Sequence, residues 1–265
     1  SRLRRSRMDL GPYTGSFSQG EREASVPPGA RVYAIGDSHG CIAQLRALRE
    51  AILEDSAEAE PAGAGAERRV VVYLGDYIDR GPDSRGLIDL LIEEPLPGFE
   101  SVHLMGNHDR FMIRFLEGRD DPAMWAMNGG EATWLSYGVD GMVPRGTPDP
   151  AIWLRAELVY RVPQEHVAFL SGLRLSHVEG DYLFVHAGIR PGVALEEQDP
   201  EDLLWIRDQF LESNADHGKV VVHGHSPSHQ PELRANRIGI DTGACYGGPL
   251  TALVLEGTER RFLQV

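Results

Sequence analysis

The chain has 265 residues, of which 42% are hydrophobic and 25% are charged, and its formal net charge is −14. This composition is typical of a globular protein and excludes a disordered chain. The sequence lacks an apolar run long enough to cross a membrane, and its net negative charge argues against nonspecific nucleic-acid binding. Two cysteines, Cys41 and Cys245, exclude a disulfide framework and predict a reducing, cytoplasmic location.

The order of sequence patterns predicts an α/β fold. Residues 1–29 are rich in Gly, Ser and Pro and are predicted to form a flexible N-terminal arm, followed by one domain over residues 30–265. Apolar strand-like runs alternate with helical spacing up to residue 109, and further strand-like runs follow residue 181. Between them, residues 110–165 are predicted to form a helical cap insert, because tryptophans recur there at helical spacing.

Several predicted strands end in a small residue followed by side chains that bind metals. Ligands gather at the carboxyl ends of strands in open α/β sheets, so we expect these side chains to lie together. Carboxylate, imidazole and amide ligands suit Mn, Fe or Zn. One open site cannot use all of them, which predicts two metal ions that share a carboxylate. The candidate ligands are Asp37, His39, Asp76, Asn107, His186 and His225.

Five ordered motifs resemble those of the calcineurin-like metallophosphoesterases: Gly36–Gly40 (GDSHG), Gly75–Gly81 (GDYIDRG), Gly106–Asp109 (GNHD), Phe184–Gly188 (FVHAG) and His223–Pro227 (HGHSP). The Asp-Arg-Gly end of the second motif is similar to the phosphoprotein phosphatase branch. Two further stretches, Trp125–Tyr137 and Ile240–Ala244, resemble bacterial and bacteriophage lambda-type members. Asp109 departs from the glutamate that is usual in eukaryotic members. The resemblance spans roughly residues 31 to 255 and implies an α/β/β/α sandwich of two mixed sheets.

The resemblance also implies a role for each candidate residue. It implies that a first metal is held by Asp37, His39 and Asp76. Asp76 would bridge to a second metal, which is completed by Asn107, His186 and His225. A hydroxide between the metals would attack the phosphorus in line. The other implied roles are those of His108 as general acid, Asp79 as its orienting partner, and Arg80, Arg207 and Asn107 as binders of the substrate phosphate.

The function implied by the resemblance is that of a metal-dependent phosphomonoesterase, specifically a serine/threonine protein phosphatase. Its expected cofactors are two divalent metal ions, Mn before Fe or Zn, and its expected partner is a phosphoprotein or phosphopeptide, with neither nucleic acid nor membrane. The alternative is a symmetrical diadenosine tetraphosphate hydrolase, which uses the same fold and metals. Asp79 favours the phosphatase, because those hydrolases typically lack an aspartate there. A noncatalytic scaffold would be expected to have lost ligands, and none is missing.

Overall fold

The computed structural model describes residues 6–9, 23–58 and 66–265, and it confirms the predicted α/β sandwich of two mixed sheets. The first sheet has the order β1-β11-β10-β2-β3-β4, in which β2, β3 and β4 are parallel and the other pairs are antiparallel. Its strands are β1 (Ser6–Asp9), β11 (Glu259–Gln264), β10 (Thr251–Glu256), β2 (Ala30–Ile35), β3 (Arg68–Tyr73) and β4 (Glu100–His103).

The second sheet has the order β5-β6-β7-β9-β8, with a parallel centre and an antiparallel strand at each edge. Its strands are β5 (Ser176–Glu179), β6 (Tyr182–Val185), β7 (Val220–His223), β9 (Arg237–Gly239) and β8 (Glu232–Leu233). Strands β2, β6, β7 and β9 are buried along their whole length, because both faces of the sheet are covered there, whereas β4, at the edge of the first sheet, is mostly exposed or half-buried.

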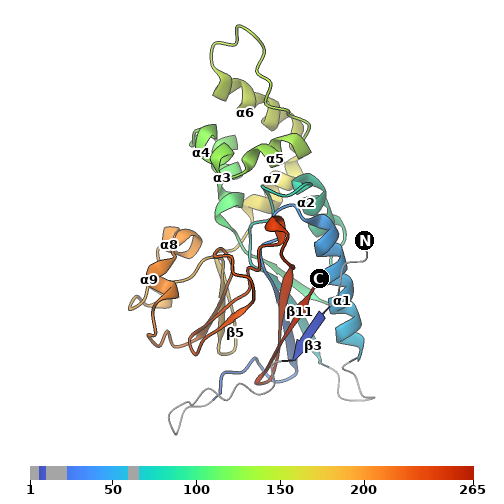
Figure 1. Cartoon of the computed structure of the whole chain (residues 1–265), viewed down its shortest axis with the longest axis vertical. Helices are drawn as coiled ribbons and strands as arrows, with labels where there is room; N and C mark the ends of the chain where they lie inside the picture. Colours follow the sequence, from blue (N-terminus) through green and yellow to red (C-terminus); the bar gives the residue numbers. More distant parts are fainter. Residues whose placement is uncertain (1–5, 10–22, 59–65) are drawn as a thin grey trace.

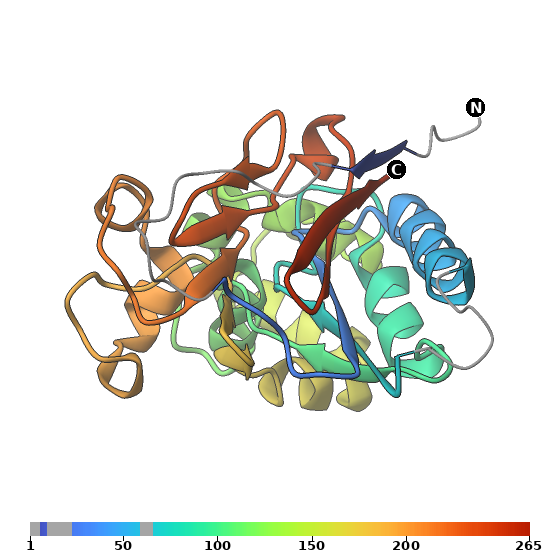
Figure 2. The same ribbon diagram turned by 90° about the horizontal axis from the view of Figure 1, so that it is seen from below.

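The alternation of side chains along each strand builds the layers. In β2, Val32 and Ala34 pack between the two sheets, whereas Tyr33 and Ile35 face the helices on the outer side. The helices on that side are α1 (Ile42–Glu58) and α2 (Ser84–Glu93), and the opposite outer face is covered by α8 (Pro200–Trp205) and α9 (Asp208–Leu211). Figure 2 shows α1 (blue) and the α8–α9 segment (orange) on opposite sides of the molecule.

A helical layer stands above the sheets in Figure 1, where the cap insert was predicted. It contains α3 (Asn107–Leu116), α4 (Pro122–Met127), α5 (Gly130–Ser136), α6 (Pro150–Arg161) and α7 (Gln164–Ser171), so its helices begin before residue 110 and end after residue 165. An Asp-Pro pair begins α4, α6 and α8, with the aspartate accepting a backbone hydrogen bond and the proline in the first turn. None of the described helices is long and apolar enough to cross a bilayer.

The described parts of the predicted N-terminal arm are held against the two sheets. Strand β1 pairs with the outer edge of β11. Val26 is buried between the sheets and donates its backbone N–H to the Gly257 carbonyl at 3.1 Å, and the backbone N–H of Ser25 donates to Asp181 at 2.9 Å. These segments therefore extend the fold, because an apolar side chain and an open strand edge both find partners. The remaining residues of the predicted arm, 1–5 and 10–22, lie outside the described residues.

Candidate metal and catalytic centre

The six candidate metal ligands lie after the carboxyl ends of parallel strands. Asp37 and His39 follow β2, Asp76 follows β3, and Asn107 follows β4. His186 follows β6 and His225 follows β7, so the second sheet supplies the other two residues of the cluster. All six side chains are buried, and we refer to them as the Asp76 cluster.

Asp76 lies at the centre of this cluster. Its Oδ2 atom is 3.4 Å from His39 Nε2 and 3.5 Å from His186 Nε2. Two groups of side chains could hold a metal ion, and both contain this carboxylate. The first group is His39, Asp76 and His108. The second group is Asp76, His186 and His225. Asp76 therefore belongs to both candidate groups, and the first group contains His108 rather than Asp37.

Two of the three imidazoles of the cluster, His39 and His186, are oriented by backbone carbonyls. His39 Nδ1 lies 2.7 Å from the Ile78 carbonyl, and His186 Nδ1 lies 2.9 Å from the Leu74 carbonyl. Each Nδ1–H donates to its carbonyl, so each Nε2 lone pair faces the cluster. Burial lowers the pKa of His39 to about 3 and that of His225 to about 2, which keeps both rings neutral and able to bind a metal.

Several independent observations indicate that the side chains of the Asp76 cluster suit divalent cations. Asp37 Oδ1 and His225 Nε2 are buried without a hydrogen-bond partner, which is costly unless a cation satisfies them. Burial, followed by repulsion from Asp241 and Asp76, raises the pKa of Asp37 well above its usual value. His186 Nε2 and Asn107 Oδ1, both acceptors in this tautomer, face each other at 2.9 Å. A cation between these groups would relieve each of these costs.

Backbone strain is concentrated in the same loops. Among the described residues, the only non-glycine residues with positive φ are His39, Asp76, Asp79, Arg80 and His225, all of them predicted site residues. Such conformations cost roughly 1–3 kcal/mol each and persist where the surrounding structure enforces them. Glycines permit the close approach: a Cβ at Gly106 would collide with Asp76, and one at Gly224 would collide with Asp37.

His108 and Asp79 form a buried pair next to Asp76. His108 Nδ1 lies 2.7 Å from Asp79 Oδ2, and the backbone N–H of His108 donates to Asp76 Oδ1 at 3.0 Å. The carboxylate of Asp79 has no exposed surface and accepts two further donors from the cap. Trp125 Nε1 lies 3.0 and 2.9 Å from its two oxygens, and Thr133 Oγ1 lies 2.5 Å from Oδ1. The pair can therefore hold and orient a proton on the ring.

Sequence reasoning missed three residues that support this arrangement. Trp125 and Thr133 belong to the stretch that resembles lambda-type members, and that resemblance was the only available signal for them. Asp109 accepts backbone N–H groups of Asp76, Tyr77 and Gly106 at 2.8 to 3.0 Å. It therefore fixes the loop that carries the central carboxylate, although its position as a departure from the eukaryotic motif gave no hint of a role.

The two predicted phosphate-binding arginines differ in their relation to the cluster. Arg80 Nη1 donates to His39 Nε2 at 2.8 Å. Burial raises the pKa of Asp241 to about 6, and the charges of Arg80 and Arg207 oppose that rise. Arg207 also contributes to the lowered pKa of His225 and His186. Arg207, at the junction between α8 and α9, is exposed and acts on the cluster through its charge, whereas Arg80 contacts His39 directly.

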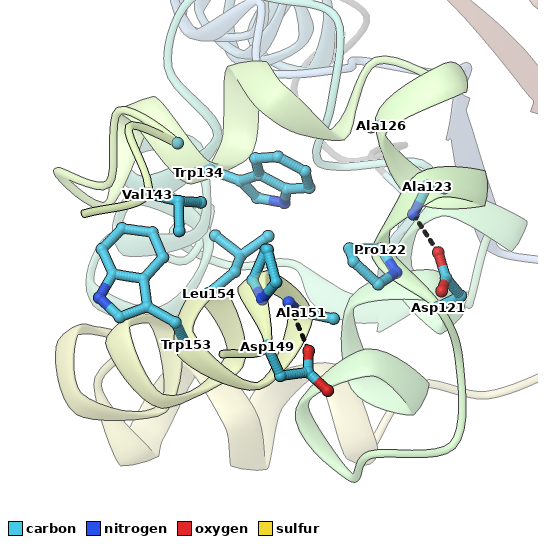
Figure 3. A pocket seen from close by; sticks show the side chains of 12 residues that line it. Asp121, Pro122, Ala123, Ala126, Trp134, Val143, Asp149, Ala151, Trp153 and Leu154 are labelled. Carbon is cyan, nitrogen blue, oxygen red and sulfur yellow. Dashed lines mark hydrogen bonds between the residues drawn. The ribbon is translucent and has the colours of Figure 1, made fainter. Parts of the chain in front are cut away.

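Two cavities differ in their relation to the cluster. The first, of about 360 Å³, lies within the cap and is lined by Trp134, Trp153 and Leu154 among others (Figure 3). Its carboxylates, Asp121 and Asp149, accept backbone N–H groups at the starts of α4 and α6, and no residue of the cluster lines it. The second cavity, of about 450 Å³, lies along α3 and has Asn107 in its wall. Only the second of these two cavities includes a residue of the cluster.

Replacing Trp125 by Phe should shift the acid side of the pH–rate profile to higher pH. Burial raises the pKa of Asp79, and the Trp125 hydrogen bond opposes that rise. Without this bond Asp79 takes up a proton at a higher pH and is then no longer the charged acceptor of the His108 Nδ1–H. Trp153→Phe, which alters the cap without touching Asp79, is the control, and an unmoved acid limb in the Trp125 variant would show that its bond is dispensable.

Comparisons with known proteins agree with this geometry at the level of the family. A family model described as calcineurin-like phosphoesterase matches residues 30–249. The chain is 27% identical over 235 residues to the bis(5'-nucleosyl)-tetraphosphatase PrpE [asymmetrical] of Bacillus thuringiensis (strain Al Hakam), covering 83% of this chain and 88% of that protein. The protein of the same name from Bacillus anthracis (strain CDC 684 / NRRL 3495) is 26% identical with the same coverage.

Two solved structures share the fold. A crystal structure of a proposed diadenosine tetraphosphatase matches with a TM-score of 0.58 and 21% identity, covering 92% of this chain and 98% of that one. A mutant cold-active protein tyrosine phosphatase matches with a TM-score of 0.53 and 17% identity, covering 89% of this chain and 80% of that one. At these identities the likeness concerns the fold alone.

Proposed function

Because this chain belongs to the calcineurin-like phosphoesterase family, we propose that it hydrolyses phosphoric esters or anhydrides with His108 as the general acid. The observation that carries this proposal is the His108–Asp79 pair, joined at 2.7 Å and held beside the Asp76 cluster. A buried carboxylate that fixes one ring nitrogen leaves the other free to deliver a proton to a leaving oxygen.

The residues present suit two divalent metal ions. Asp37, His39 and Asp76 would hold the first, and Asp76, Asn107, His186 and His225 would hold the second. We propose Mn as the first choice, with Fe and Zn as alternatives, because the donors mix carboxylate, imidazole and amide oxygen. When bound, such ions supply an acidified water for the attack and positive charge for the phosphoryl oxygens.

The chain's own residues supply the other requirements of the reaction. Arg80 and Arg207 would bind the outer phosphate oxygens, a task for which the guanidinium fork is suited. His108 would give its Nε2 proton to the departing oxygen, while Asp79 keeps Nδ1 protonated and stabilises the charged ring. The burial of this pair strengthens its mutual electrostatic interaction, because the surroundings exclude water.

For the substrate we favour a dinucleoside tetraphosphate. The supporting observation is the name of the relatives that match 83% of the chain, which describes asymmetrical cleavage of such molecules. This reverses the order expected from the sequence, where the phosphoprotein came first and the dinucleotide alternative was the symmetrical hydrolase. The His108–Asp79 pair is compatible with this substrate, since it can assist any leaving group that gains from a proton.

A phosphoserine or phosphothreonine protein is the second candidate. The specific observation in its favour is again the pair of Asp79 and His108. A serine or threonine alkoxide is a poor leaving group and gains more from a proton than a nucleotide phosphate does. A phosphorylated segment of polypeptide would then have to reach the cluster past the cap.

A direct comparison of kcat/KM for diadenosine tetraphosphate and a phosphothreonine peptide, in one buffer with Mn, tests the assignment. We expect the dinucleotide value to be higher by about tenfold or more, equal to ~1.4 kcal/mol of transition-state preference. Chromatography of the products separates the two modes of cleavage, because asymmetrical hydrolysis yields two different nucleotides and symmetrical hydrolysis yields two identical ones. An Asp76→Asn preparation controls for contaminating phosphatases, and a tenfold preference for the peptide would replace the dinucleotide with the second candidate.

A further inference from the structure

The cavity along α3 has one wall that begins inside the Asp76 cluster. Asn107, Arg110, Phe111 and Arg114 line it, at intervals of three and four residues that place them on one face of the helix. Residues Glu201 and Trp205 of α8 line it as well. A molecule bound by the cluster through a phosphate could therefore extend directly into this space. Its volume of about 450 Å³ falls within the range of small-molecule sites, roughly 300–1,000 Å³.

Trp205 gives this cavity an aromatic surface beside the cluster. Its ring centroid lies 5.4 Å from that of Phe111 and 6.0 Å from that of His225, with edge-to-face angles of 78° and 85°. These contacts fix the indole, yet 38% of the residue remains exposed. A large aromatic side chain that is held rigidly and left accessible can stack on a planar ring at little entropic cost.

Each of the two arginines in the cavity wall is paired with a carboxylate of the same wall. Arg110 forms an ion pair with Glu201 across the cavity. Arg114 forms a bidentate pair with Asp120 at 2.7 and 2.8 Å. The amino end of α3, at Asn107, adds the partial positive charge of a helix N-terminus on the side of the cluster. The charged side chains of the cavity wall therefore balance, and the helix N-terminus at Asn107 and the apolar ring of Trp205 both lie next to the cluster.

We propose that this cavity is a nucleoside-binding subsite, in which the base of the substrate stacks on Trp205 and the attached phosphates pass Asn107 toward Asp76. This inference rests on the proposed function, because it assigns a binding site to one nucleoside of the dinucleotide. It makes Trp205 a specificity-determining residue for nucleotide substrates, with Phe111 holding its ring in place.

Calorimetric titration of the Mn-loaded protein with two matched ligands tests the subsite. The ligands are adenosine 5'-(α,β-methylene)diphosphate and methylenediphosphonate, which share the phosphonate group and differ by the adenosine. We expect the adenosine to improve affinity in the unaltered protein and Trp205→Ala to remove roughly tenfold to a hundredfold of that gain, the range of one base–aromatic stack. Binding of methylenediphosphonate should not change, and Trp205→Phe should keep part of the gain.

Tyr160→Ala provides the matched control, because this tyrosine lies on the cap and is 87% exposed. Equal weakening of both ligands in Trp205→Ala would mean that the indole only supports His225, and no change in either would mean that the base binds elsewhere. Both results would overturn the proposal. The test is independent of dinucleotide hydrolysis: a loss confined to the adenosine ligand supports the subsite even if the preferred substrate proves to be a phosphopeptide.

Discussion

His108→Ala is expected to lower kcat for an alkyl phosphate ester by about 10²- to 10⁴-fold, the usual contribution of a positioned general acid. The substitution removes the imidazole that Asp79 holds at 2.7 Å but keeps the backbone N–H that donates to Asp76. The loop that carries the central carboxylate should therefore stay in place. Steady-state rates on a phosphothreonine peptide provide the measurement.

The same variant should lose much less activity on p-nitrophenyl phosphate, whose leaving group needs little protonation. His229→Ala, at an exposed histidine outside the cluster, serves as the control and should behave like the unaltered protein. An equal loss of activity on both substrates would mean that His108 positions the phosphate or binds a metal ion. The second role is open to it because His108 belongs to one of the two candidate metal groups.

Asp76→Asn is expected to reduce activity by more than about 100-fold. This loss is larger than the one expected from changing a residue that only forms a hydrogen bond to a metal ligand. Asp76 Oδ2 lies 3.4 and 3.5 Å from ring nitrogens of His39 and His186, so one substitution affects both candidate metal positions. The amide has nearly the same shape as the carboxylate and can still accept the His108 N–H. The loss should therefore reflect the missing charge and not a collapsed loop.

Metal analysis and thermal unfolding test the same variant without relying on activity. The unaltered protein reloaded with Mn should approach two ions per chain and unfold at a higher temperature than the chelator-treated protein, because a ligand that binds only the folded state stabilises it. Asp76→Asn should lose most of both effects, whereas Asp140→Asn, at an exposed carboxylate in the cap, should keep them. Full activity with saturation at a single ion would falsify the shared-carboxylate arrangement.

The sequence by itself determined which residues meet at the Asp76 cluster. Each candidate ligand follows an apolar strand, and parallel strands end at the same edge of their sheet. Residues that directly follow such strands therefore lie close together in the fold. The sandwich was implied by the family resemblance, and within it the period of two in β2 places Val32 and Tyr33 on opposite faces. These features depend on neighbours within one strand–loop unit and on a topology with few alternatives.

Only the tertiary structure decided what surrounds that cluster. Trp125 and Thr133 lie 46 and 54 positions from Asp79, yet both donate to its carboxylate, because the cap folds back over the loop after β3. Likewise Val26 lies between the sheets, and Trp205 contacts Phe111 across a cavity that neither helix forms alone. Contacts of this kind depend on how separate elements pack, and the periodicity of a single segment carries no information about its distant partner.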